Sequence, residues 1–335
     1  MLTMKRVLLA TVVLSSIILV AGGLWFHRSL WGTRSSRATE IEIAAGSTAR
    51  EILAQLHAED LLPSVLAGRI YLKTLASGQA LHYGHYRFPP ASRPVDALET
   101  ILEGAVEMFA VTVVEGSNLA TIGEQFSSLG LGTADEWLAF GQRLEWISAF
   151  VANAPSLEGF LFPDTYRFAV GIPAERVAHH LVERFEDVWM EEAQKTEALW
   201  GSTLEIVTLA SLVEAETSLD EERPLVAGVF ANRLRRGMLL QCDPTVVYAL
   251  ERRQEWRGRL LRIHWEVDDP YNTYRYPGLP PGPINSPGRA ALAAAINPQP
   301  TPYLYFVAKP GGGHAFSKTL GEHNRAVARL MSSRR

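Results

Sequence analysis

The order of hydrophobic and polar positions divides the chain into an apolar N-terminal segment and a longer amphipathic remainder. Residues 7–26 carry no charge and are mostly apolar. At about 1.5 Å per residue, a helix of this length spans the roughly 30 Å hydrocarbon core of a bilayer. The pattern predicts a single membrane-spanning helix within residues 1–26, then a polar tether over residues 27–40. A cleaved signal peptide ending near Ala21 stays the alternative, and the flanking basic residues do not decide the orientation.

A second pattern occurs twice, about seventy residues apart: an apolar strand, a Gly-Ser turn and a short amphipathic helix. In the first copy Thr48 and Glu51 have capping-box spacing, which predicts the helix start. The pattern resembles the opening half of a LysM module, a small sugar-binding unit, although a purely structural repeat explains it equally well. We therefore predict a small LysM-like α+β domain over residues 41–106. The matching positions are Ile43, Gly46, Ser47, Ile52, Gln55, Leu56 and Leu61 in the first copy, and Val113, Gly116, Ser117, Ile122, Gln125, Phe126 and Leu131 in the second.

The remaining residues, 107–335, alternate helical and strand-like patterns and predict a larger mixed α+β domain. Residues 276–288 contain five prolines, which excludes a helix or a central strand and predicts a long, stiff loop. Loops of this length in compact domains are often functional. Helices are predicted over residues 177–193, 203–219 and 222–236, and a strand over residues 303–308 that ends in a hairpin turn at residues 311–313.

The helix that begins at Thr203 carries the candidate for acid chemistry. At 100° per residue, Glu216 falls within about 20° of the centre of the apolar stripe, whereas Glu214 falls about 140° from it and is predicted to face solvent. A carboxyl group on the core side is desolvated, which raises its pKa toward the range that a general acid needs. A buried structural pair between Glu216 and an arginine is the alternative that periodicity leaves open.

Two polar clusters follow this helix. Gln241, Asp243 and Thr245 interrupt two apolar stretches, and Asp-Pro-Thr could also begin a helix with Pro at its first position. The second cluster comprises Tyr271, Asn272 and Tyr274. Tyrosine rings and amide groups suit sugars, because they offer apolar faces together with hydrogen-bonding groups. By composition alone, the second cluster could equally be a strand with exposed tyrosines.

Composition excludes several classes of protein. Of 335 residues, 47% are hydrophobic and 20% charged, which excludes long disorder and a polytopic membrane protein. The net charge of −4 gives no general footprint for nucleic acid. The sole cysteine, Cys242, excludes an internal disulfide framework and a Cys-rich zinc site. His264 and Glu266 have the spacing of a zinc deaminase without its cysteine pair, and we expect neither a metal nor a cofactor.

A series of ordered motifs resembles the YceG-like family, also called the MltG family, of endolytic murein transglycosylases. The resemblance implies that Glu216, the glutamate directly before Thr217, is the catalytic acid. Two positions depart from the family pattern: Cys242 stands where Thr is common, and Asn285 where we expect Ala. The motifs cover residues 158–166, 209–217, 229–234, 240–248, 271–274, 278–284, 302–308 and 312–316, alongside the LysM-like unit and the membrane anchor.

The resemblance implies cleavage of the β-1,4 bond between N-acetylmuramic acid and N-acetylglucosamine inside peptidoglycan strands, leaving 1,6-anhydro ends. Residues 27–335 would then lie outside the cytoplasmic membrane, with peptidoglycan synthases as candidate partners. Two alternatives stay open: a non-catalytic peptidoglycan-binding scaffold, and a muramidase that uses water. The expected contacts to the sugar, or supports of the acid, are Gln241, Asp243, Thr245, Tyr271, Asn272 and Tyr274.

Overall fold

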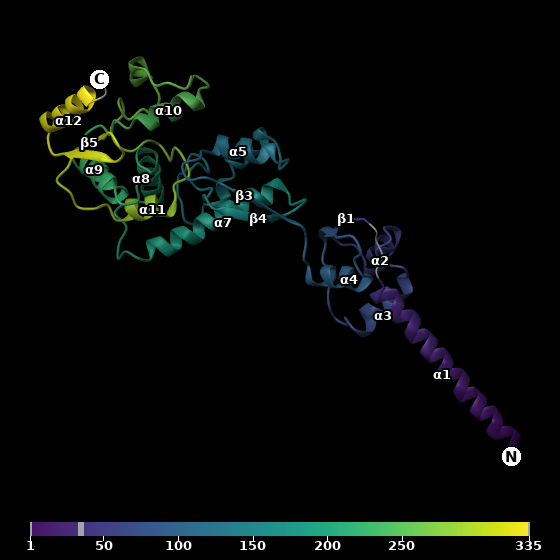
Figure 1. Cartoon of the computed structure of the whole chain (residues 1–335). Helices are drawn as coiled ribbons and strands as arrows, with labels where there is room; N and C mark the ends of the chain where they lie inside the picture. Colours follow the sequence, from purple (N-terminus) through teal and green to yellow (C-terminus); the bar gives the residue numbers. More distant parts are fainter. Residues whose placement is uncertain (1, 33–36, 334–335) are drawn as a thin grey trace. The chain divides into compact units, whose positions relative to one another are not determined.

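The computed structural model describes residues 2–32 and 37–333 (Figure 1). The chain forms two compact units. The first comprises residues 1–110 and 167–171, and the second comprises residues 111–166 and 172–335. The mixture of helices and small two-stranded sheets confirms the predicted α+β class.

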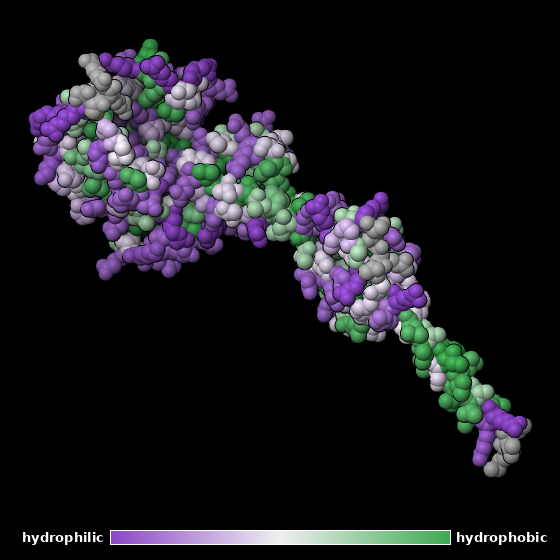
Figure 2. Space-filling view, in the orientation of Figure 1, coloured by the Kyte–Doolittle hydropathy of each residue, from purple (hydrophilic) through white to green (hydrophobic). Residues whose placement is uncertain are grey.

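The N-terminal helix α1 (Leu2–Trp31) has two parts with different surroundings. Its apolar side chains are exposed as far as Leu24, and Figure 2 shows this hydrophobic surface along the helix. The helix is long and apolar enough to span a membrane. Its last turns pack into the first unit, where Leu30 is fully buried and Phe26 contacts the same core. Residues 27–31 of the predicted tether are therefore helical, and residues 33–36 lie outside the described part of the chain.

The first copy of the repeat forms a strand–helix–helix–strand unit. Its two strands pair antiparallel, with Thr39 opposite Phe88 and Ile43 opposite Gly84. The predicted capping box is confirmed, because Thr48 accepts a hydrogen bond from the Glu51 backbone and the Glu51 carboxylate accepts one from Thr48. The elements are β1 (Thr39–Ile43), α2 (Ala49–Ala58), α3 (Val65–Thr74) and β2 (Gly84–Phe88), followed by α4 (Pro94–Glu103).

The second copy repeats the same local geometry. In the first copy the Gln55 side-chain amide donates to the carbonyl oxygen of Glu42 at 2.8 Å, and in the second Gln125 donates to Thr112 at 2.8 Å. The turn glycine has a φ of 84° in one copy and 79° in the other, which only glycine adopts without strain. This copy contains β3 (Met108–Thr112), α5 (Leu119–Ser128), α6 (Ala134–Phe140), the short η1 (Leu144–Trp146) and β4 (Thr165–Ala169), and β3 pairs with β4.

The second unit is built around α8 (Thr203–Glu216), in which every residue from Ile206 to Val213 is buried. The predicted helices, the long proline-rich loop and the hairpin turn are confirmed, with two changes of bounds. The helix predicted over residues 203–219 ends at residue 216, and the strand predicted from residue 303 begins at residue 305. The other elements of this unit are α7 (Ala174–Ala193), α9 (Arg223–Arg235), α10 (Asp243–Arg252), η2 (Arg262–Glu266), α11 (Arg289–Ile296), β5 (Tyr305–Ala308), β6 (His314–Ser317) and α12 (Leu320–Ser333).

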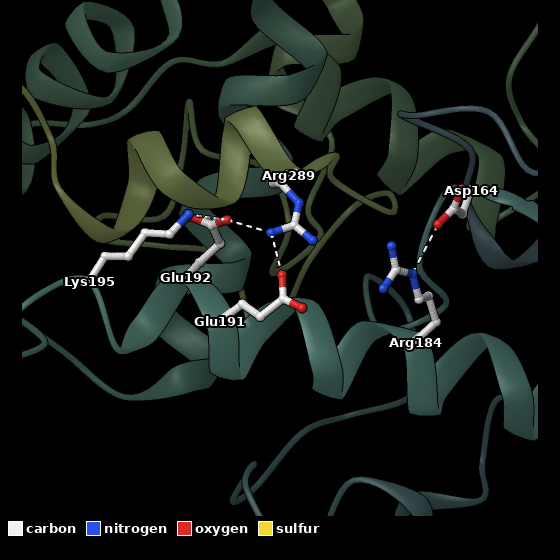
Figure 3. Close-up of polar contacts among 6 residues, drawn as sticks. All are labelled: Asp164, Arg184, Glu191, Glu192, Lys195 and Arg289. Carbon is white, nitrogen blue, oxygen red and sulfur yellow. Dashed lines mark hydrogen bonds and ion pairs between the residues drawn. The ribbon is translucent and has the colours of Figure 1, made fainter.

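A polar network fixes the end of the proline-rich loop. Arg289, the first residue of α11, donates to Glu191 and to Glu192 on α7, each at 2.7 Å (Figure 3). Lys195 also binds the Glu192 carboxylate. Because α11 packs directly on α8, this network fixes the loop residues that precede α11 relative to the helix that carries Glu216.

Candidate active site

Glu216 is the last residue of α8, and its side chain lies in a cavity. The helix begins with a capping box at Ser202 and ends where Thr217 turns to an extended backbone conformation, so Glu216 has no further helical turn in front of it. The cavity has a volume of about 320 Å³, and Glu216 is half-buried in its wall. We call this the acid cavity, and its lining residues are Glu216, Arg233, Leu240, Gln241, Asp243, Tyr274, Tyr305, Phe306, Val307, Ala308, His314, Leu320 and His323.

The surroundings of Glu216 favour its protonated form. Burial raises the pKa of its carboxyl group, and the negative charge of Asp243 raises it further. A hydrogen bond from the Cys242 thiol and the charges of His314 and Arg233 oppose this rise without cancelling it. The carboxyl group therefore keeps its proton to a higher pH than an exposed glutamate does, and it still reaches the cavity.

The prediction that Glu214 faces solvent is wrong. Its carboxylate accepts a hydrogen bond from Arg223 at 2.8 Å and another from the backbone of Gly288 at 3.0 Å. Its side chain is only 7% exposed. The buried glutamate–arginine pair that we considered for Glu216 is thus made by its neighbour two residues earlier.

Three of the predicted contact residues line the acid cavity: Gln241, Asp243 and Tyr274. Asp243 begins α10, as the Asp-Pro-Thr alternative proposed, and its Oδ1 accepts hydrogen bonds from the Tyr274 hydroxyl at 2.6 Å and from the Trp265 indole at 3.1 Å. The rings of Trp265 and Tyr274 stack with their centroids 5.1 Å apart. Tyr274, stacked on Trp265 and fixed by a carboxylate, thus forms an aromatic wall of the cavity next to the candidate acid.

The other three predicted residues are buried behind this wall. Thr245 donates to the Cys242 carbonyl oxygen at 2.7 Å. Asn272 donates to the carbonyl oxygens of Trp265, within η2, and of Val267, just after it. The guanidinium carbon of Arg252 lies over the Tyr271 ring, 4.7 Å from the ring centroid. These contacts hold the segments that carry the cavity residues, and direct contact with a sugar stays a prediction for these three.

Two basic side chains that line the acid cavity, Arg233 and His314, were not among the predicted site residues. Arg233 donates from Nε to the Leu304 carbonyl oxygen at 2.7 Å and from Nη1 to that of Leu240 at 2.6 Å. His314 contacts the Glu222 carboxylate through Nδ1 at 2.7 Å. Both residues lie within segments that carry the family resemblance, so these motifs could have indicated them as site residues, whereas hydrophobic periodicity could not.

A second cavity of about 630 Å³ adjoins the first, because Asp243 lines both. Tyr248, one of its lining residues, donates to the buried Glu158. The Glu158 carboxylate also accepts a hydrogen bond from the first backbone N–H of α5. Burial raises the pKa of Glu158 to about 7. We call this the lateral cavity, and its lining residues are Glu115, Gly116, Ser117, Asn118, Thr121, Ala215, Asp243, Pro244, Val247, Tyr248, Glu251, Leu260, Ile284 and Asn285.

Comparison with known proteins identifies the family of the chain. The chain is 30% identical to an endolytic murein transglycosylase of Bacillus subtilis (strain 168), over 95% of this chain and 92% of the relative. It is 29% identical to an endolytic murein transglycosylase of Streptococcus pneumoniae (strain ATCC BAA-255 / R6), over 90% of this chain but only 60% of the relative. A crystal structure of a YceG-like protein from Listeria monocytogenes aligns with a TM-score of 0.57 at 30% identity, covering 87% of this chain and 100% of that one. The YceG-like family matches residues 41–329, and the chain therefore belongs to this family.

Proposed function

We propose that this protein is a membrane-anchored lytic transglycosylase, which cleaves the bond between N-acetylmuramic acid and N-acetylglucosamine within peptidoglycan strands. The observation that carries the proposal is the half-buried Glu216 with its raised pKa in an open cavity beside an aromatic wall. Such a wall suits a sugar ring. The relatives from B. subtilis and S. pneumoniae are named as endolytic murein transglycosylases, which supports the same activity.

One carboxyl group is enough for both halves of this reaction. Protonated Glu216 donates its proton to the glycosidic oxygen as the bond from C1 of the muramyl residue to that oxygen breaks. The resulting carboxylate then accepts the proton of the C6 hydroxyl group, whose oxygen bonds to C1. The products are a 1,6-anhydro end and a new free hydroxyl group, and no water is consumed. This scheme requires an acid that begins protonated, which its burial favours.

The residues around Glu216 take supporting roles in this proposal. Asp243 and Tyr274 are locked to each other and so present a fixed surface to the substrate, while Gln241 lies at the rim of the acid cavity. Arg233 places positive charge where the leaving oxygen and the carboxylate exchange a proton, and His314 lines the same cavity. Thr245, Tyr271 and Asn272 position these groups from behind.

A water-using muramidase is the second candidate, and Asp243 is the observation that favours it. Two carboxyl groups in one cavity are the usual equipment of glycosidases that use water. In this structure, however, Oδ1 of Asp243 already accepts hydrogen bonds from Tyr274 and Trp265. We therefore assign Asp243 to orientation of the site.

The proposed location follows from the substrate. Peptidoglycan lies outside the cytoplasmic membrane, so we infer that α1 spans this membrane and that the rest of the chain lies on its outer side. An anchored enzyme would meet new strands close to where they emerge, with peptidoglycan synthases as candidate partners. The LysM-like unit would raise the local concentration of glycan near the active site.

Digestion of purified glycan strands tests the proposal. The wild-type protein should produce 1,6-anhydro ends, detected by mass spectrometry, and Glu216→Gln should reduce the rate by at least about a hundredfold because it removes the proton donor. The matched control is Glu124→Gln on the exposed face of α5, which should keep full activity. Reducing ends would favour the muramidase, and intact strands the binding scaffold. Full activity in a correctly folded Glu216→Gln variant would overturn the residue assignment.

A further inference from the structure

Asn285 is an unusual member of the wall of the lateral cavity. Its side chain is only 5% exposed, and its Nδ2 donates to the backbone oxygen of Ser211 on α8 at 3.0 Å. Its Oδ1 has no hydrogen-bond partner among the described residues. A buried acceptor without a partner costs about 1–3 kcal/mol, so proteins seldom keep one unless another molecule satisfies it.

The backbone on both sides of Asn285 is held rigidly. Ile284 donates to the Ser211 hydroxyl at 3.1 Å, which fixes the segment to α8. On the other side, Ser286 exchanges backbone hydrogen bonds of 2.9 Å and 2.8 Å with Gly116 and Ser117, in the Gly-Ser turn of the second repeat copy. Ser211 precedes Glu216 by five residues, or about 7.5 Å along the helix axis. Asn285 is therefore held against α8 about one and a half helical turns before Glu216.

The charges of the lateral cavity restrict what it can bind. Glu115, Asp243 and Glu251 all line it, and Asn118 donates to Glu251 at 3.1 Å. Arg223 lies 3.6 Å from Glu115, but it is buried and paired more closely with Glu214 at 2.8 Å. A ligand with a free carboxylate would be repelled here, whereas an uncharged group that offers N–H and O–H donors would find several acceptors.

We propose that the lateral cavity is a subsite for an uncharged N-acetylhexosamine unit of the glycan, next to the bond that is cleaved, and that its acetamido N–H donates to Oδ1 of Asn285. The turn of the second repeat copy forms part of this subsite through Ser117 and Asn118. The inference rests on the proposed function and adds a specificity residue to it.

Binding of the N-acetylglucosamine tetramer to the full-length protein tests this subsite. The Glu216→Gln background prevents cleavage, and titration calorimetry measures the dissociation constant. Asn285→Ala should weaken binding roughly tenfold, because a hydrogen bond to a buried acceptor contributes about 1.4 kcal/mol. The matched control is Asn297→Ala, which removes an exposed asparagine outside both cavities and should leave the constant unchanged. Equal affinity in the parent and Asn285→Ala, or no binding by the parent, would overturn the subsite.

A cleavage assay separates this inference from the proposed function. With Glu216 intact, Asn285→Ala should raise KM on purified strands and leave kcat close to the wild-type value, because the contact binds sugar and does not move a proton. Anhydro ends from both proteins with the same KM would reject the subsite and keep the function. Absence of cleavage by the wild type would reject the function, and the binding constants would still decide the subsite. If Asn285→Ala lowers the unfolding temperature, Asn285→Ser serves as the second variant, since its hydroxyl is too short to reach the position of Oδ1.

Discussion

At the scale of single residues, Glu214 and Glu216 show how two like side chains on one helix acquire different tasks. Glu214 is buried against a permanent cation and a backbone N–H, so its charge is compensated and its role is structural. Glu216 has no ion pair of this kind among the described residues, and its burial favours the proton instead. The environment, and not the residue type, separates the structural carboxylate from the chemical one.

Cys242 should set the pH range over which Glu216 is protonated. Its thiol is a weak donor to the carboxylate, and a stronger donor would stabilise the charged form more. Cys242→Ser should therefore lower the pKa of Glu216, and the fall of activity at alkaline pH should begin at a lower pH than in the wild type. Cys242→Ala removes the donor and should shift the alkaline limb of the pH–activity profile to higher pH. The measurement is kcat on purified strands as a function of pH.

The opposite directions of these two variants provide the control. A merely structural role for Cys242 would lower kcat in both variants at every pH and leave the alkaline limb in place. Limbs that coincide with the wild type in both variants would show that the thiol does not tune the acid.

At the scale of elements, hydrophobic periodicity predicted which residues form helices and strands more accurately than it predicted whether each side chain is buried. The repeat, the capping box at Thr48 and the hairpin near residues 311–313 depend on local chemistry, so the sequence alone is enough to find them. The error at Glu214 has a tertiary cause. Helix α8 packs against α9, α10 and α11, so a position away from the apolar stripe still faces protein. Asn285 and Arg233 were missed as site residues for the same reason, since contacts distant in sequence place them at the cavities.

Glu158 links three elements and should make the stability of the second unit depend on pH. It caps α5 at Leu119 and accepts from Tyr248 on α10. Its pKa rises from an ordinary value of 4.5 to about 7 in the folded protein. Between these values the folded state keeps a proton that the unfolded state has lost, so the free energy of unfolding falls as pH rises. The contribution is fully present below pH 4.5, and about 3 kcal/mol is lost by the time the pH exceeds 7.

Urea unfolding of the detergent-solubilised protein between pH 5 and pH 8 measures this dependence. Glu158→Gln does not titrate, so its free energy of unfolding should decrease less over this range than that of the wild type. Its amide can still accept from Leu119 while donating to the Tyr248 hydroxyl, which keeps the cap. Glu124→Gln, an exposed change on α5, should retain the full wild-type slope. Equal slopes in Glu158→Gln and the wild type would show that Glu158 is ionised throughout.

At the scale of the whole molecule, α1 runs without a break from an exposed apolar part, long enough to span a membrane, into the core of the first unit. Residues 4–25 are exposed and suit a bilayer, whereas Phe26, Leu30 and Trp31 pack against the core of the first unit. The last turns of the anchor are thus part of a globular domain. An anchor joined in this way transmits its position to the unit above it more directly than a flexible linker of the same length would.

Two truncations should separate the membrane role of α1 from its packing role. A chain that begins at Trp25 loses the lipid-facing residues and should move to the soluble fraction with its first unit folded. A chain that begins at Arg37 also loses Leu30, which is fully buried, and removal of a buried leucine side chain alone costs about 2–5 kcal/mol. Its first unit should therefore unfold at a clearly lower temperature by circular dichroism, while both chains still cleave purified strands through the second unit. Identical unfolding curves for the two chains would show that α1 is only an anchor.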